Sequence, residues 1–216
     1  GLTEIQKLIL QFIIVGAYLL SVALAGGTTE TVIPFLGSVD LGFFYYILAA
    51  VFIVGMVNAV NFTDGIDGLN TSVTLVVALV FSVIAMLLNR VGLSLYAAAI
   101  VGAMIGFLFW NANPAKVFMG DTGSLFLGGA VCALAFGVDM PILLILIGII
   151  YIVEILSVVL QVTYFKISHG KRIFKMAPIH HHFEMCGWNE NKICFVFSGV
   201  TLFAGILGVL LAVFGC

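Results

Sequence analysis

Long apolar runs alternate with short polar interruptions along the whole chain. A helix needs about 20 mostly apolar residues to cross a membrane, and seven runs approach or reach that length. These runs are Ile5–Ala25, Phe43–Ala59, Val73–Leu88, Ser94–Trp110, Leu125–Val138, Pro141–Phe165 and Ile193–Phe214. The pattern therefore predicts an all-α, polytopic transmembrane helical bundle that forms a single membrane domain over residues 1–216.

Two stretches qualify this simple picture. The fifth run is short and lies close to Pro141, so the fifth and sixth runs are expected either to abut as a hairpin or to include a re-entrant segment. Between the first two runs, threonines and β-branched residues precede Pro34 and Gly37. That order predicts a short β-hairpin within Gly26–Gly42.

Composition places the chain in the membrane and excludes other classes. Hydrophobic residues make up 63% of the chain and charged residues 8%, with a mean hydropathy of +1.28. This is too little polar surface for a water-soluble globule of that size. A net charge of -2 excludes a strongly basic nucleic-acid binder, so no nucleic acid is expected as a partner. The four cysteines lack metal-type spacing and indicate neither a zinc site nor a disulfide framework.

The basic residues predict the orientation of the bundle. If the residues before the first run are cytoplasmic, only Arg90 lies outside. The residues that then fall inside are Lys7, Lys116, Lys166, Lys171, Arg172, Lys175 and Lys192. This asymmetry predicts a topology in which three polar segments, Asn58–Thr71, Asn111–Ser124 and Lys166–Lys192, share the cytoplasmic face.

Most acidic, amide and histidine groups that can do chemistry lie in these three segments. A transporter would be expected to place such groups near the bilayer midplane, at broken helices within repeated halves. An enzyme that takes its substrate from the cytosol would place them at one face. A membrane scaffold would need no such concentration of polar groups, so the pattern favours an enzyme.

The first polar segment runs from Asn58 through Asn61, Asp64 and Asp67 to Asn70. Asp64 and Asp67 are three residues apart, so both carboxylates would project from one face if the stretch is helical. Paired acids attract a divalent metal or a cationic group of a substrate. The alternative is a turn followed by a helix cap, since Asn, Asp and Gly favour both.

The second segment places Asp121 between two glycines at the start of an apolar run. A helix start with hydroxyl side chains suits a phosphate–metal complex, so Asp121 is a candidate Mg²⁺ ligand; the alternative is an N-cap. Phe118 is an aromatic residue in a polar loop. It is available to stack on a nucleobase, unless its ring dips into the membrane interface.

The third segment contains three adjacent histidines, His180, His181 and His182. Adjacent histidines rarely face one metal ion, so hydrogen bonding to phosphate or nucleotide is the preferred interpretation. In the run before it, Glu154, Ser157 and Gln161 form one polar stripe, which must face the bundle or a wet cavity. Gln161 is a candidate substrate contact, whereas Glu154 is as readily structural.

Three motifs in order now carry a resemblance that runs through the whole chain. They are Asn58-Ala-Val-Asn-Phe-Thr-Asp-Gly-Ile-Asp-Gly-Leu69, Phe118-Met-Gly-Asp-Thr-Gly-Ser124 and Ala177-Pro-Ile-His-His-His-Phe-Glu184. The chain resembles the phospho-N-acetylmuramoyl-pentapeptide transferases, within the polyprenyl-phosphate N-acetylhexosamine-1-phosphate transferases. The resemblance implies transfer of phospho-MurNAc-pentapeptide from UDP-MurNAc-pentapeptide to undecaprenyl phosphate in peptidoglycan synthesis. Lipid I and UMP are the implied products and Mg²⁺ the implied cofactor.

The resemblance also implies roles for individual residues. Asp121 matches the Mg²⁺ ligand, Asp64 and Asp67 match the active-site acids with Asp67 near the uracil, and Phe118 matches the aromatic that stacks on uracil. His180 is expected to be catalytic with Asp64 and Asp121. The positions that match the lining of the pocket for nucleotides and nucleoside inhibitors are Asn58, Asn61, Asn111, Gln161, His180, His181 and His182. The lipid bilayer and a second copy of the chain, as a homodimer, are the other implied partners.

One departure from the family pattern is important. The family has earlier helices and a cytoplasmic loop with an aspartate pair followed by a lysine, and the stretch Gly1–Lys7 resembles the residues just after that loop. Gly1 is not an initiator methionine and no signal peptide precedes the first run, so the chain is expected to be incomplete at its N-terminus and inactive alone. Because this acid pair is not in the sequence, two mechanisms stay open: direct attack by the lipid phosphate, and transfer through a covalent phospho-enzyme. A sister transferase that uses UDP-GlcNAc is the alternative enzyme.

Overall fold

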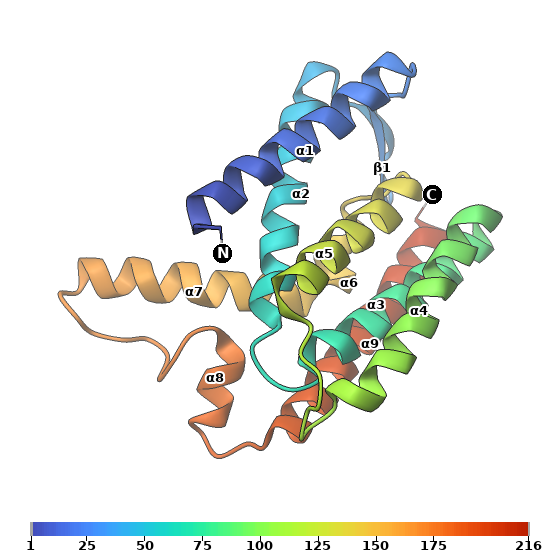
Figure 1. Cartoon of the computed structure of the whole chain (residues 1–216). Helices are drawn as coiled ribbons and strands as arrows, with labels where there is room; N and C mark the ends of the chain where they lie inside the picture. Colours follow the sequence, from blue (N-terminus) through green and yellow to red (C-terminus); the bar gives the residue numbers. More distant parts are fainter. Residues whose placement is uncertain (1, 216) are drawn as a thin grey trace.

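The computed structural model describes residues 2–215, so Gly1 and the last of the four cysteines, Cys216, lie outside the described residues. Within that range, seven helices are long and apolar enough to cross a membrane (Figure 1). They are α1 (Glu4–Leu24), α2 (Phe43–Thr63), α3 (Leu69–Leu87), α4 (Val91–Asn111), α5 (Gly120–Gly137), α7 (Ile149–Ile167) and α9 (Glu190–Phe214). The predicted all-α membrane bundle is confirmed.

The helices begin where the sequence supplies caps. The Thr3 side chain accepts a hydrogen bond from the backbone of Gln6, and the Gln6 side chain accepts one from the backbone of Thr3, which makes a capping box. Asn189 caps α9 by accepting the backbone N–H of Lys192. These caps satisfy backbone donors that a helix start otherwise leaves without partners.

The predicted hairpin is present between α1 and α2. Strands β1 (Glu30–Ile33) and β2 (Gly37–Asp40) pair antiparallel, with Glu30 opposite Asp40. The backbone N–H of Val32 donates to the carbonyl of Asp139, 2.8 Å away. The hairpin therefore packs on the turn after α5 and closes the end of the bundle opposite the polar segments.

The fifth and sixth predicted runs differ from the observed helices. Helix α5 begins at Gly120 rather than Leu125, and the sixth run is divided at Gly148 into α6 (Leu143–Ile147) and α7. A Cβ at Gly148 would lie 2.7 Å from the carbonyl oxygen of Leu144, so the break needs a residue without a side chain.

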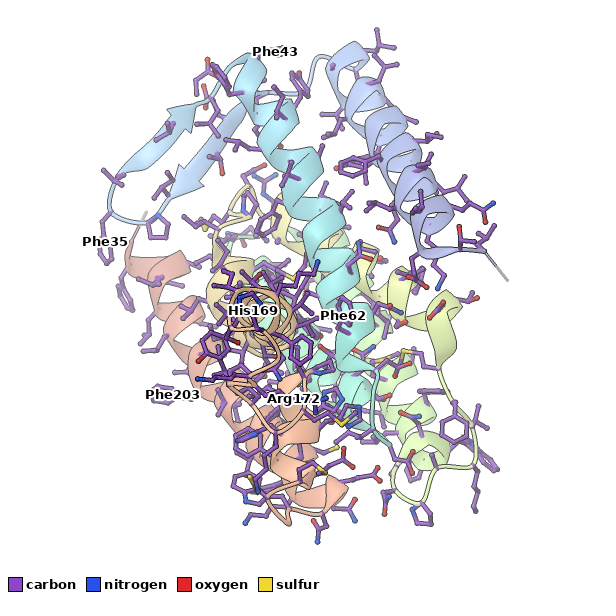
Figure 2. The ribbon with its side chains drawn as sticks, turned by 90° about the vertical axis from the view of Figure 1, so that its left-hand side faces the viewer. Phe35, Phe43, Phe62, His169, Arg172 and Phe203 are labelled. Carbon is purple, nitrogen blue, oxygen red and sulfur yellow. The ribbon has the colours of Figure 1, made fainter. Side chains whose placement is uncertain are left out.

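Helix α7 crosses the rest of the bundle steeply (Figure 1). Figure 2 looks along it, with His169 and Arg172 at its near end. Helix α7 packs against α2, while several of its large side chains, such as Leu156, Leu160 and Phe165, are exposed.

The core lies where α3 packs between α4 and α9. Phe81 and Ile84 of α3 are fully buried there. Close approach depends on small residues: a Cβ at Gly128 of α5 would lie 2.6 Å from the Cα of Val57 in α2. Tight packing at these crossings holds the polar ends of α2, α3, α5 and α9 in register.

Candidate functional site

Asp67 joins parts of the chain that are far apart in the sequence. Its Oδ2 accepts hydrogen bonds from the backbone N–H of Ala115 at 2.8 Å and from Asn113 Nδ2 at 3.3 Å. Its own N–H donates to Glu190 Oε2 at 2.9 Å. The loop after α2, the loop after α4 and the start of α9 therefore meet at one end of the bundle (Figure 1).

Asp64 and Asp67 do not share a helical face. Both lie in the non-helical stretch between α2 and α3, where Asp64 follows the last residue of α2. Asp64 accepts a hydrogen bond from the backbone of Gly120, whereas Asp67 faces the loop of residues 113–115. The idea of paired carboxylates on one helix is wrong, because the helix ends before them; the turn is what the structure contains.

Asp121 lies in the first turn of α5, with Met119 as N-cap, and its side chain is 55% exposed. The Lys7 ammonium lies 2.5 Å from Asp121 Oδ2, and Asn61 Nδ2 lies 3.2 Å from Oδ1. The same Asn61 nitrogen donates to Ser124 Oγ at 2.8 Å. In the sequence, Lys7 served only as one of the basic residues that predict the orientation of the bundle. No pattern near Lys7 indicates a contact with a residue 114 positions away.

Asp64, which lies just outside the spanning helix α2, has a clearly raised pKa. Burial raises the pKa of Asp64 from 3.8 to about 6, and the nearby charge of Asp121 adds to the rise. The hydrogen bond from Gly120 opposes it. A raised carboxyl pKa beside a second carboxylate is typical of a site that binds a cation or transfers a proton.

Asn58 and Phe118 lie at the edge of this region. Asn58 is half-buried, and its Nδ2 donates to Gln11 Oε1 at 2.6 Å, which ties α2 to α1. Phe118 is 74% exposed in the loop before α5. An exposed ring is accessible both to a ligand and to the membrane interface, so base stacking by Phe118 stays a prediction.

Two predicted substrate contacts are instead engaged with the protein itself. Asn111 is buried, where its Oδ1 accepts from Thr71 Oγ1 at 2.5 Å and its Nδ2 donates to the carbonyl of Val117 at 3.0 Å. Gln161 is buried, and its amide makes three hydrogen bonds to the backbone of Ile173 and Phe174. In this structure both side chains hold loops in place and do not face an open surface.

The three histidines of α8 (Ile179–Glu184) face three different partners. His180 is fully buried against Glu154, with Nδ1 3.0 Å from Oε2. His181 is hydrogen-bonded to Glu184, and His182 Nδ1 accepts the backbone N–H of Lys175 at 3.1 Å. His181 and His182 are partly exposed and His180 is fully buried, so the catalytic role expected for His180 stays a prediction.

A magnesium ion is compatible with the acids at this end. No three His, Cys, Asp or Glu side chains within residues 2–215 come together to hold a metal by themselves. Mg²⁺ often uses only one or two protein carboxylates and takes its other ligands from water and substrate phosphates. The exposed Asp121 carboxylate already attracts a cation, the Lys7 ammonium, and Asp64 lies beside it. The donor set fits.

Comparison with known proteins identifies close relatives of this chain. The sequence profile described as Glycosyl transferase family 4 matches residues 1–139. A phospho-N-acetylmuramoyl-pentapeptide-transferase of Clostridium perfringens is 53% identical over 94% of the chain and 62% of its own length. The proteins of the same name from Clostridium botulinum and Listeria monocytogenes are 50% and 46% identical, over 96% and 99% of the chain and 64% and 66% of their own lengths. The chain thus spans a little under two thirds of the curated relatives it matches.

Proposed function

Because this chain belongs to glycosyl transferase family 4, we propose that it forms the larger part of an enzyme that moves phospho-MurNAc-pentapeptide from UDP-MurNAc-pentapeptide to undecaprenyl phosphate. The products would be lipid I and UMP. The observation that carries the proposal is the meeting of Asp64, Asp67 and Asp121 at one end of an apolar bundle. A phosphorylated lipid in the membrane and a soluble nucleotide can both reach such an end.

The reaction brings two anions together, and the site would have to offset their repulsion. Asp121, with Asp64 beside it, would hold Mg²⁺. When bound, the ion would supply positive charge to the phosphates of the UDP-sugar. Lys7, which now neutralises Asp121, would be free to pair with a phosphate once the metal takes its place.

The nucleotide would be held by the loops on either side of Asp67. Phe118 would stack on uracil and Asp67 would accept a hydrogen bond from the base. Asn58, Asn61, His181 and His182 would line the remaining polar surface. Asn111 and Gln161 would act indirectly, since each fixes the backbone of a loop.

The membrane setting completes the proposal. The polar end would face the cytoplasm, in keeping with the basic asymmetry of the sequence. The protein would function as a homodimer and would bind nucleoside inhibitors that mimic uridine.

The test uses the complete natural protein in membranes, with radiolabelled UDP-MurNAc-pentapeptide and undecaprenyl phosphate. Mg²⁺-dependent appearance of label in the lipid, matched by UMP release, is the expected result. UDP-GlcNAc serves as the competing donor. Transfer from UDP-GlcNAc alone would replace this proposal with the sister reaction, and solute flux without UMP would indicate a transporter.

A further inference from the structure

A buried acid–base pair connects α7 to α8. Glu154 and His180 are both fully enclosed, with 3.0 Å between Oε2 and Nδ1. Enclosing such a pair in an apolar bundle is costly, and exchanging it for apolar residues is often neutral or stabilising. The pair therefore requires an explanation other than stability.

The opposite edge of the His180 ring lies against the acid-bearing loop. A Cβ at Gly65 would lie 2.2 Å from His180 Nε2, so the ring rests on the backbone between Asp64 and Ile66. Gly65 is exposed on its other side. Within residues 2–215, neither His180 Nε2 nor Glu154 Oε1 has a hydrogen-bond partner. The His180 ring is thus packed between the buried Glu154 carboxylate and the loop at Gly65, and it is called the wedge below.

The two acids of this loop are held by different groups. Asp67 is fixed by Ala115, Asn113 and Glu190, none of which belongs to α7 or α8. Asp64 adjoins Gly65, the residue that the His180 ring contacts. The wedge therefore acts on the half of the loop that carries Asp64.

We propose that Glu154 is a positioning residue for the transfer reaction. Its carboxylate accepts the Nδ1–H of His180, holds the ring against Gly65 and so sets the place of Asp64 beside Asp121. The inference rests on the proposed function for its catalytic consequence. It makes His180 a positioning residue as well, acting through Gly65 and not by contact with substrate.

The test compares three variants of the complete natural protein. Glu154→Met keeps the length of the side chain and removes the acceptor, whereas Glu154→Gln keeps an acceptor oxygen for His180. Ser157→Ala is the matched control, because Ser157 lies one turn away on the same face and donates to the backbone carbonyl of Glu154, not to its carboxylate.

Two measurements are made on each variant: amide hydrogen exchange of residues 64–67, and kcat and KM for the UDP-sugar. Glu154→Met is expected to speed exchange and lower kcat by about tenfold or more, because small misplacements of reacting groups are costly. KM should change by less than about twofold, since Asp67 keeps its own supports. Glu154→Gln and Ser157→Ala should stay near the parent in both measurements.

Each outcome decides the proposal. Unchanged exchange in Glu154→Met overturns it, and so does faster exchange with unchanged kcat. Equal losses in the Gln and Met variants would mean that charge, not the hydrogen bond, matters, and would also overturn it. A parent protein that transfers nothing rejects the proposed function instead, while hydrogen exchange still reports on the wedge.

A double-mutant cycle tests the wedge without any activity assay. Gly65→Ala should lower the thermal midpoint of the parent because the new Cβ meets the ring. In a His180→Ala background the same change should have little effect, since the ring is gone. Additive losses would contradict the contact on which the proposal stands.

Discussion

Asp121 is the exposed carboxylate to which we assign the metal. We expect Asp121→Asn in the complete enzyme to abolish turnover and leave folding intact, because an exposed charge is lost and no packing changes. UMP release at saturating Mg²⁺ and the thermal midpoint check the two halves of this prediction. Asp139→Asn is the control, since Asp139 is 50% exposed and ion-paired with Arg90 at the opposite end. Turnover retained within tenfold would remove the metal assignment.

Asp64 links the site to the pH dependence of stability. Its raised pKa of about 6 favours the protonated form in the fold, so its stabilising contribution is complete below about pH 4 and is lost as pH rises through about 6. With a metal chelator present, so that no ion binds the carboxylate, Asp64→Asn should therefore raise the midpoint of thermal unfolding at pH 7.5. The same change should have little effect at pH 4.

Asp40 provides a control of opposite sign. Hydrogen bonds from Thr29 and Gly42 lower the pKa of Asp40, so its contribution is present above about pH 4 and is lost as pH falls through the lowered pKa. Asp40→Asn should lower the midpoint at pH 7.5. The assignment of the Asp64 shift would be contradicted if both variants moved the midpoint in the same direction.

Phe118 should contribute to binding and not to chemistry. Stacking on a base is worth about 1–3 kcal/mol, so Phe118→Ala should weaken UMP binding by roughly tenfold or more. Calorimetry or competition with labelled UMP measures this change. Phe109→Ala, which removes an 81% exposed phenylalanine from the preceding helix, should leave UMP affinity unchanged. Unaltered affinity in Phe118→Ala would instead favour a ring at the membrane interface.

At the scale of elements, α7 organises the segment after it. Gln161 makes three hydrogen bonds to Ile173 and Phe174 and so fixes the return of the chain toward α8. We expect Gln161→Leu to free this loop and to speed tryptic cleavage after Lys171 and Arg172 several-fold. Mass spectrometry of the fragments gives the rate, with Ser157→Ala as control. Equal cleavage rates would show that the loop is ordered by other contacts.

At the scale of the molecule, every functional inference depends on the two ends of the bundle. The hairpin and the polar segments lie at opposite ends (Figure 1). Single cysteines at Thr29 and Lys175, in a background without the native four, should react with an impermeant thiol reagent from opposite sides of sealed membranes. Labelling from the same side would mean that one of the predicted spans does not cross.

The sequence alone predicted the seven long apolar helices, the hairpin and the segments that carry the acids. Membrane insertion depends on hydropathy summed over about 20 neighbouring residues, and a short turn depends on a few adjacent ones. Both are local properties that can be read in order along the chain. The break at Gly148 was missed because residues 141–153 are all apolar or glycine and give no local signal for it, and only packing against neighbouring helices shows where the backbone must part.

The tertiary structure alone decided which polar side chains remain available. Asn58, Asn111, Gln161 and His180 look alike in the sequence as polar groups in or near the three segments. Asn111 and Gln161 are hydrogen-bonded to the backbone of nearby loops, and His180 is buried against Glu154. Lys7 pairs with Asp121, a residue 114 positions further along the chain. Hydrogen bonding depends on distances of about 3 Å between atoms, and those distances are set only when elements far apart in sequence pack together.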